Sequence, residues 1–329
     1  MNSDTTTHNT LVADIGGTNA RFALTGPGQH QPSDILTLAV ADYSSIESAI
    51  RDYLRQINYL GSLQQACLAI ACPVAQDYIS MTNSGWSFSK TELGRALKLD
   101  RLEVINDYAA QAYAIPHLDD SDLVKVGAGE SFIGQPIALL GPGTGLGVGG
   151  LVPSASGATA IITEGGHVDF APTNALEIEI LNYLWRHHSH VSVERVLSGM
   201  GLTNLHLALA SIRGQQQESL TPDQISHAAL EQQDPLCLEV LECFCAILGS
   251  VAGNTALTLG AQGGVYIAGG IIPRMVEFFA NSEFRSRFEA KGRFRNYLHA
   301  TPTYVVTASQ PGLLGSAAVL RQPMALSGR

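Results

Sequence analysis

Two stretches of the chain follow the same plan of apolar runs and glycine turns. The first is LVADIGGTNARFAL, residues 11–24, and the second is PIALLGPGTGLGVGGLVP, residues 136–153. In each, an apolar strand enters a glycine turn and a second apolar strand leaves it. The repetition predicts a duplicated unit built on paired strands.

Helical and strand-like patterns alternate along the rest of the chain. A helix start is indicated where Thr221, a typical cap, precedes Pro222 at the first helical position. Strands that alternate with helices favour a layered α/β fold. The predicted elements are helices at 44–60, 175–188, 220–230, around 278–294 and at 311–321, strands at 66–72, 102–107 and 303–307, and a loop at 162–172.

One segment, Cys245–Ile272, has no charged residue and is long enough to cross a bilayer. It nevertheless contains seven glycines and several polar residues, among them Asn254 and Gln262. We therefore expect a buried helix that ends near Leu259, a turn at GAQGG and a core strand at VYIAGG.

Length and composition indicate a globular enzyme-sized protein. The 329 residues, 45% of them hydrophobic, favour two domains. The net charge is 19 − 29 = −10, and Lys and Arg form no run, which argues against nucleic acid or an anionic membrane as partner. The polar start, MNSDTTTHNT, does not look like a signal peptide, so we expect a frayed tail and a cytoplasmic protein. Five cysteines without a CxxC pair predict reduced, mostly buried thiols.

The stretch DIGGTNAR has the chemistry of a phosphate site. A turn between antiparallel strands can present the N–H groups of Gly16, Gly17 and Thr18 to phosphate oxygens. Asp14 would then lie where a Mg²⁺ ion bridges the phosphates. The alternative is an ordinary hairpin with a glycine turn and a capping Asp.

Two further glycine turns could complete a nucleotide site. GPGTGLG would form the second side of a phosphate clamp through Gly143, Thr144 and Gly145. In AGGIIPR, Gly269 and Gly270 could lie flat against an adenine or a ribose. Glycine turns are common, so a purely structural role is the alternative for each.

Asn106 and Asp107, at the end of the strand LEVIND, are the candidate chemical centre. A carboxylate at the C-terminal edge of a strand opens on the crevice where α/β sheets bind ligands. Phosphoryl transfer to a hydroxyl needs such a proton acceptor. The alternative role for the carboxylate is to cap the helix that follows.

Other polar residues suit a sugar. Glu164 and His167 in TEGGH, with Glu194 in VERVLSG, offer acceptors and a donor for a polyol. Glu164 and His167 could also form a metal pair, but no third ligand accompanies them at a characteristic spacing. The cluster His187, His188 and His190 is interpreted as solvated residues near the negative end of a helix.

Eight segments, in order, closely resemble bacterial ATP-dependent glucokinase from about residue 11 to residue 321. They are DIGGTNARFAL, MTNSGWSF, INDYAAQAYAIP, GPGTGLGV, EGGHVDFAP, ERVLSGMGL, GGVYIAGGIIPR and PGLLGSAA. That family belongs to the hexokinase, actin and Hsp70 superfamily. The resemblance implies an α/β fold of two ribonuclease H-like (actin-like ATPase) domains with a cleft between them.

The same resemblance implies the reaction, transfer of the ATP γ-phosphoryl group to the 6-hydroxyl of D-glucose in glycolysis, with ATP and Mg²⁺ as cofactors. Asp107 would be the base. Further implied are a homodimer, a small domain of residues 11–117 with 308–329, and a large domain of residues 118–307. It implies ATP bound by Ala13, Asp14, Ile15, Gly16, Gly17 and Thr18, and glucose bound by Asn106, Asp107, Glu164, His167 and Glu194.

Related proteins limit how far the resemblance reaches. The repressor and sugar-kinase group shares the DIGGT and EGGH-like signals but has a cysteine-rich zinc motif shortly after the histidine, whereas HVDFAPTNALEIE has no cysteine. Ala13 stands where glycine is frequent, and Met200 where proline or arginine is frequent. The alternatives are a kinase for another hexose or an aminosugar, and a sugar-responsive regulator or actin-like assembly protein. About ten residues before the first strand are too few for a DNA-binding module.

Overall fold

The computed structural model describes residues 9–26, 29, 31–81, 85–155, 157–216 and 219–322. Residues 1–8 of the predicted N-terminal tail, residues 82–84 of MTNSGWSF and residues 323–329 of the predicted small domain lie outside this description. The chain forms two compact units. The predicted domain boundaries stay a prediction, since a compact unit is not yet a domain that folds alone. The first unit holds the chain up to Asp119, Ser154–Ile162 and the chain from Ala308, and the second holds Asp120–Pro153 and Thr163–Thr307.

The first unit is built on a five-stranded sheet with the order β3-β2-β1-β4-β7. Strand β1 is antiparallel to β2 and parallel to β4, and β4 is parallel to β7. Its elements are β1 (Thr10–Ile15), β2 (Asn19–Thr25), β3 (Ser33–Ala39), α1 (Ile46–Gln56), β4 (Gln65–Ile70), β5 (Tyr78–Ser80), β6 (Ser87–Ser89), α2 (Lys90–Ala96), β7 (Arg101–Asn106), α3 (Asp107–Ala114) and α11 (Pro311–Arg321).

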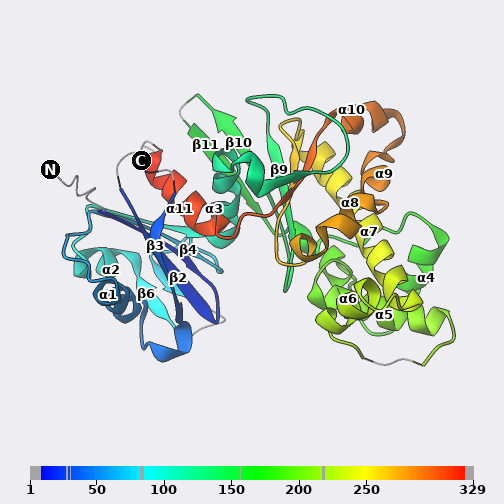
Figure 1. The fold of residues 1–329 in the computed structure, drawn as a ribbon, viewed down its shortest axis with the longest axis horizontal. Coiled ribbons are helices and arrows are strands. Elements are labelled where there is room, and N and C mark those ends of the chain that lie inside the picture. Colours follow the sequence, from blue (N-terminus) through cyan, green and yellow to red (C-terminus); the bar gives the residue numbers. More distant parts are fainter. Residues whose placement is uncertain are drawn as a thin grey trace. The chain divides into compact units, whose positions relative to one another are not determined.

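Helices α3 and α11 lie side by side although they are far apart in the sequence (Figure 1). Their close approach requires glycine at Gly315, since a Cβ atom there would lie 1.7 Å from the carbonyl oxygen of Ala110. Helix α11 also packs on β1, where the Ser316 hydroxyl donates a hydrogen bond to the Ala13 carbonyl at 3.3 Å. The last helix of the chain therefore completes the first unit.

The second unit repeats the strand plan of the first. Its strands β10, β9, β12, β13 and β8 belong, in that order, to a six-stranded sheet, in which β9 is antiparallel to β10 and parallel to β12. This arrangement confirms the predicted duplication. The remaining strand of that sheet, the edge strand β11 (Gly157–Thr163), belongs to the first unit except for Thr163. The elements of the second unit are β8 (Leu123–Lys125), β9 (Ile137–Pro142), β10 (Leu146–Ser154), α4 (Ala175–Leu184), α5 (Gly199–Ile212), α6 (Pro222–Leu230), α7 (Pro235–Leu259), β12 (Val265–Ile267), α8 (Val276–Asn281), α9 (Phe284–Glu289), α10 (Arg295–Ala300) and β13 (Thr303–Val306).

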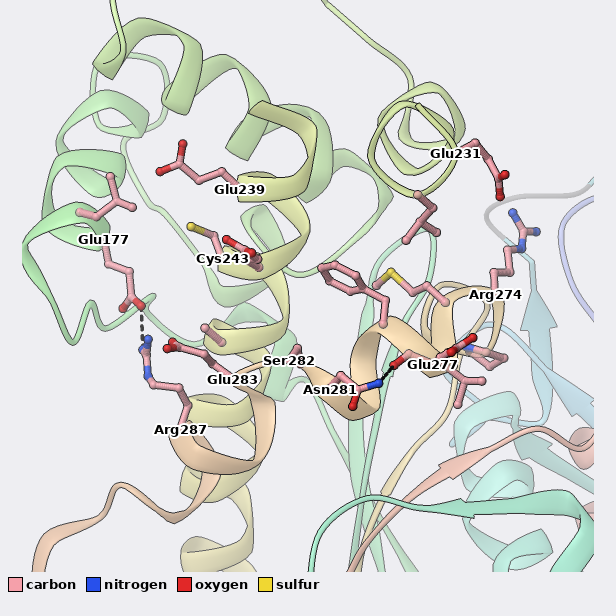
Figure 2. A pocket seen from close by; sticks show the side chains of 18 of the residues that line it. Glu177, Glu231, Glu239, Cys243, Arg274, Glu277, Asn281, Ser282, Glu283 and Arg287 are labelled. Carbon is pink, nitrogen blue, oxygen red and sulfur yellow. Dashed lines mark hydrogen bonds and ion pairs between the residues drawn. The ribbon is translucent and has the colours of Figure 1, made fainter. Parts of the chain in front are cut away.

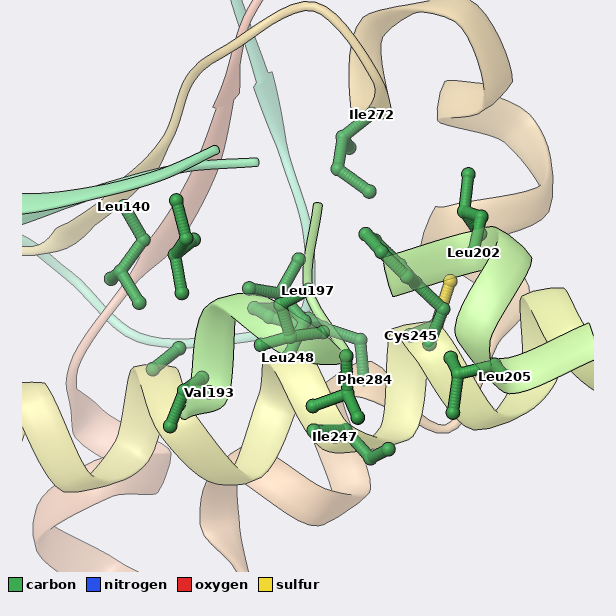
Figure 3. Packing of buried hydrophobic residues seen from close by; sticks show 14 of the residues in the cluster. Leu140, Val193, Leu197, Leu202, Leu205, Cys245, Ile247, Leu248, Ile272 and Phe284 are labelled. Carbon is green, nitrogen blue, oxygen red and sulfur yellow. The ribbon is translucent and has the colours of Figure 1, made fainter. Parts of the chain in front are cut away.

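Helix α7 is the centre of the second unit's core. It is long and apolar enough to cross a membrane, but 72% of its most apolar window is buried inside the structure. Figure 3 shows Cys245, Ile247 and Leu248 of this helix packed among side chains from α5, α9 and β9. The helix ends at Leu259 with Gly260 in the left-handed conformation, followed by strand β12. The expected buried helix, turn and core strand are thus confirmed.

Short sequence patterns also predicted several other elements correctly and one helix incorrectly. Thr221 caps α6 in a reciprocal capping box with Gln224, and α11 spans the predicted residues. The single helix predicted around 278–294 is wrong, because α8 ends at Asn281 and α9 begins at Phe284. Ser282 makes the break: its hydroxyl donates to the Phe279 carbonyl at 2.7 Å and accepts from the Phe284 N–H at 3.2 Å.

Candidate active site

Asp14 is the next-to-last residue of β1 and faces Arg21 across the hairpin. Their side chains form an ion pair with an Nη1–Oδ2 distance of 3.4 Å. Burial raises the pKa of Asp14, the Arg21 guanidinium lowers it, and the nearby Asp107 carboxylate raises it further. The two predicted chemical carboxylates of the first unit are therefore electrostatically coupled.

The glycine turn after β1 uses part of its hydrogen-bonding capacity internally. The Gly16 N–H donates to the Asn19 carbonyl at 2.9 Å, and the Thr18 carbonyl accepts from Val40 at 2.8 Å. Of the three N–H groups expected to face phosphate, that of Gly16 thus closes the turn. The groups of Gly17 and Thr18 are at the tip of the hairpin.

The N-terminus of α11 abuts Asp14. A Cβ atom on Gly312 would lie 2.9 Å from the Asp14 Cγ atom and 3.0 Å from Oδ2. Only glycine therefore lets the helix approach the carboxylate this closely. Gly312 belongs to the motif PGLLGSAA, whose pattern alone did not predict this contact.

Asn106, not Asp107, caps helix α3. The Asn106 Oδ1 atom accepts hydrogen bonds from the N–H groups of Tyr108 at 2.9 Å and Ala109 at 3.3 Å. Asp107 is the first residue of the helix, and its Oδ1 atom accepts from Tyr108 at 2.9 Å. The capping alternative considered for the carboxylate is thus fulfilled by its neighbour.

Asp107 is half-buried directly after β7, and this burial raises the pKa of its carboxyl group. Hydrogen bonds from the backbone N–H groups of Tyr108 and Asp107 and from the Asn106 side chain oppose the shift. A carboxylate with a raised pKa is a stronger proton acceptor than an ordinary aspartate.

In the second unit, Glu194 is bonded to the second glycine turn. Its Oε2 atom accepts a hydrogen bond from the Leu146 N–H at 2.8 Å. A Cβ atom on Gly145 would lie 2.4 Å from the same oxygen, so the turn and the carboxylate fit only with glycine there. The turn is closed by Gly143, whose N–H donates to Gly145 at 2.8 Å and whose carbonyl accepts from Gly199 at 2.7 Å.

The third glycine turn lies next to the second. Gly269 has a φ of +81°, and a Cβ atom there would lie 2.4 Å from the Pro142 carbonyl oxygen. The Gly270 nitrogen is 3.9 Å from the Cβ position of Gly143. The parallel pairing of β9 and β12 thus brings both predicted nucleotide turns to one edge of the sheet.

Residues 164–170, called here the EGGH loop, pack on the start of β10. A Cβ atom on Gly166 would lie 2.2 Å from the Leu146 carbonyl oxygen, and one on Gly165 would lie 2.9 Å from Val148. The Glu164 and His167 side chains project into solvent, 88% and 61% exposed, with their nearest charged atoms 4.0 Å apart. Leu146 therefore links the loop to Glu194 and to the second glycine turn.

Among the residues described above, no group of three or more His, Cys, Asp or Glu side chains is arranged to hold a metal ion. Asp14 by itself could be the protein ligand of a Mg²⁺ ion. Proteins often bind Mg²⁺ through one carboxylate, and phosphate oxygens and waters are its other ligands. The half-buried Asp14 carboxylate, which Arg21 neutralises only in part, suits that role.

A cavity of about 1010 Å³ in the second unit lies apart from these loops (Figure 2). Several glutamates surround it, and Figure 2 shows Glu177 and Arg287 directed toward one another. The Arg287 Nη2 and Glu177 Oε1 atoms are 2.7 Å apart. None of the predicted site residues lines this cavity. Its Arg287–Glu177 pair joins α9 to α4.

A model of the glucokinase family matches residues 11–323 of the chain. The chain belongs to the glucokinase family. The glucokinase of Hahella chejuensis (strain KCTC 2396) is 48% identical over 311 residues, which are 94% of this chain and 96% of that protein. The crystal structure of a glucokinase from an Antarctic psychrotroph has a TM-score of 0.89 at 40% identity and covers 94% of this chain and 98% of its own.

A more distant structure shares the fold alone. It is a ROK family glucokinase from Streptomyces griseus in complex with glucose and AMPPNP, with a TM-score of 0.63 at 18% identity, covering 94% of this chain and 98% of its own. The chain thus has the expected actin-like ATPase fold, and its activity is the ATP-dependent phosphorylation of glucose.

Proposed function

We propose that Asp107 is the general base in the transfer of the ATP γ-phosphoryl group to the 6-hydroxyl of glucose. As the sugar oxygen forms its bond to the γ-phosphorus, the bond from phosphorus to the β–γ bridging oxygen breaks and its electron pair leaves on ADP. The hydroxyl proton passes to the Asp107 carboxylate. The products are glucose 6-phosphate and ADP.

The observation that supports this role most is the identity of the residue that caps α3. Asn106 caps the helix, so Asp107 is not needed for that purpose. Its carboxylate has a pKa raised by burial, which favours proton uptake. A positioned base and a positioned hydroxyl are the main contributions that a protein can make to phosphoryl transfer.

We propose further that glucose is oriented by polar side chains of both units. Asn106 and Asp107 come from the first unit, and Glu164, His167 and Glu194 come from the second. The exposure of Glu164 and His167, on a loop whose backbone is tied to β10, supports their role as ligands. Glu194 can serve both the sugar and the glycine turn, since a carboxylate accepts several hydrogen bonds.

ATP would be held by the three glycine turns, at residues 13–18, 143–145 and 269–270. Backbone N–H groups in such turns form concave sites for phosphate oxygens. Because the Gly16 N–H closes its own turn, Gly17 and Thr18 are the proposed phosphate donors of the first loop. A Mg²⁺ ion held by Asp14 would neutralise the negative charge that develops on the phosphates.

The sugar and the hydroxyl assigned here are tested by the rate of ADP formation with a panel of hexoses and aminosugars. We expect the highest kcat/KM with glucose and a product phosphorylated at carbon 6, as seen by ³¹P and ¹³C NMR. A higher kcat/KM for another hexose or for an aminosugar would replace the substrate assignment. Glucose binding without turnover would instead support a regulator.

Assembly and location are parts of the same proposal. We infer a homodimeric cytoplasmic enzyme of glycolysis that binds neither nucleic acid nor membranes. The support is the ATP dependence of the family, the net charge of −10, and five free cysteines, four of them buried. Sedimentation equilibrium of the purified protein should give twice the mass of one 34.9 kDa chain.

A further inference from the structure

His190 is bonded to the EGGH loop through both nitrogens of its ring. The Nε2 atom lies 3.0 Å from the backbone carbonyl oxygen of His167. The Nδ1 atom lies 3.2 Å from an oxygen of the Asp169 carboxylate. His190 is exposed, as expected for a solvated histidine, but it also contacts the loop through both nitrogens.

The hydrogen bond to His167 has a fixed direction. A backbone carbonyl carries no proton to give, so the Nε2 atom of His190 must be the donor. The Asp169 carboxylate lies at the other nitrogen of the ring, so that two groups of the EGGH loop contact this one side chain.

The backbone around this contact is fixed independently of the side chain. Phe170 donates its N–H to Val191 at 2.9 Å, and Val193 donates to Val168 at 2.9 Å. Asp169 and Ser192 face each other in the antiparallel bridge between these bonds. Replacement of His190 should therefore leave the two segments paired.

The His190 ring shares a hollow of about 360 Å³ with several other titratable groups. The groups that face it are Asp169 and His167 of the EGGH loop, His187 and His188 after α4, and Glu194 and Arg195 of the segment before α5.

We propose that His190 is a positioning residue for glucose. By donating to the His167 carbonyl, the His190 ring fixes the peptide that carries the His167 side chain, and it steadies the loop that presents Glu164. The proposal rests on the sugar-binding role assigned above to this loop. His190 itself needs no contact with the substrate.

The test compares His190→Ala, His190→Gln and a matched control, His187→Gln. We expect His190→Ala to raise the glucose KM roughly three- to tenfold, the scale of one lost hydrogen bond, with the ATP KM and kcat within about twofold of wild type. Glutamine keeps a donor for the His167 carbonyl and should restore most of the affinity. His187, which packs on the Tyr183 ring at 5.1 Å, should be replaceable without effect.

Two further variants, Glu164→Ala and His167→Ala, distinguish failure of this inference from failure of the proposed function. If they lose glucose affinity while His190→Ala keeps the wild-type KM, positioning is overturned and the sugar site stands. If they keep full affinity, the sugar role of the loop falls, and the positioning role falls with it. Equal changes of both KM values, kcat and the melting temperature in His190→Ala would make the residue structural only.

Discussion

The Glu194 carboxylate and the Leu146 backbone N–H form a 2.8 Å hydrogen bond that joins residues 48 positions apart. Leu146 begins strand β10 directly after the second glycine turn, and Glu194 lies in a short helical turn before α5. Glu194, which was predicted to be a sugar ligand, therefore also stabilises the second glycine turn, which was predicted to bind the nucleotide. This connection couples the two halves of the proposed active site within the second unit.

Replacement of Glu194 should separate its two roles. In Glu194→Gln the amide oxygen can still accept from Leu146, so the ATP KM should stay within about twofold while the glucose KM rises. In Glu194→Ala the Leu146 N–H loses its partner, and the ATP KM should rise roughly five- to tenfold as well. The measurement is steady-state kinetics in which one substrate is varied while the other is saturating. Identical ATP KM values in the two variants would contradict a role of the Glu194–Leu146 hydrogen bond in ATP binding.

Gly145→Ala should act through the same bond. The new Cβ atom would lie 2.4 Å from the Glu194 Oε2 atom, which must move away from Leu146. We therefore expect a rise of the ATP KM similar to that of Glu194→Ala. The two changes should not add, because the double variant has no carboxylate to displace. A double-mutant cycle on the ATP KM checks this, and simple additivity would mean that the alanine disturbs the turn directly.

Asp14→Asn should remove activity without loss of stability. Burial raises the pKa of Asp14 above its unfolded value of 3.8, so the folded protein binds a proton there more tightly than the unfolded chain. Above the pKa that Asp14 has in the folded protein, its ionised carboxylate therefore lowers the free energy of unfolding. This destabilisation disappears as the pH falls below 3.8, where the carboxyl group is protonated in both states. We expect turnover to fall by at least tenfold, with little recovery at high Mg²⁺, while the melting temperature at pH 7 is equal to or above that of wild type.

The matching control is the pH series of the melting temperature. Any gain in Asp14→Asn should shrink toward acidic pH, where the wild-type carboxyl is protonated too. If the carboxylate only stabilised the hairpin through Arg21, the variant would melt earlier at pH 7 and keep its activity per folded molecule.

Features with local signals could be predicted from the sequence. The Thr221–Pro222 pair marks the start of α6, and glycine turns between apolar runs mark both hairpins. The strand plan of the two sheets followed from the repetition of those hairpins. Such signals act within a few residues, so no knowledge of tertiary contacts is needed to interpret them.

The contacts that shape the candidate site could not be predicted in this way. Gly312 reaches Asp14 only because α11 returns to the first sheet, and Glu194 reaches Leu146 only through the packing of the second unit. His190 looked like one of three solvated histidines, yet it alone is bonded to the backbone of the EGGH loop. These pairings depend on tertiary structure, and one sequence carries no local trace of them.

Asp107→Asn tests the proposed base most directly. A sugar ligand and a catalytic base both require an oxygen at this position, but only the base requires a proton acceptor. Asparagine keeps the shape and one carbonyl oxygen, which can still accept from Tyr108, so the fold and the α3 cap on Asn106 should persist. Glucose binding measured by calorimetry should stay within about tenfold of wild type. Turnover at saturating glucose and ATP should drop by roughly 10² or more, the scale of a lost acid–base group.

The pH profile gives this experiment its internal control. Because burial raises the pKa of Asp107, protonation should inactivate the wild-type enzyme at a higher pH than the ordinary value of 3.8 would suggest. Asparagine does not titrate there, so the residual activity of the variant should lack that acidic decline. A carboxylate can also orient the hydroxyl, and for this reason the whole loss is not assigned to proton transfer. Near wild-type turnover would refute the base, whereas lost binding with unchanged residual chemistry would leave Asp107 as a sugar ligand only.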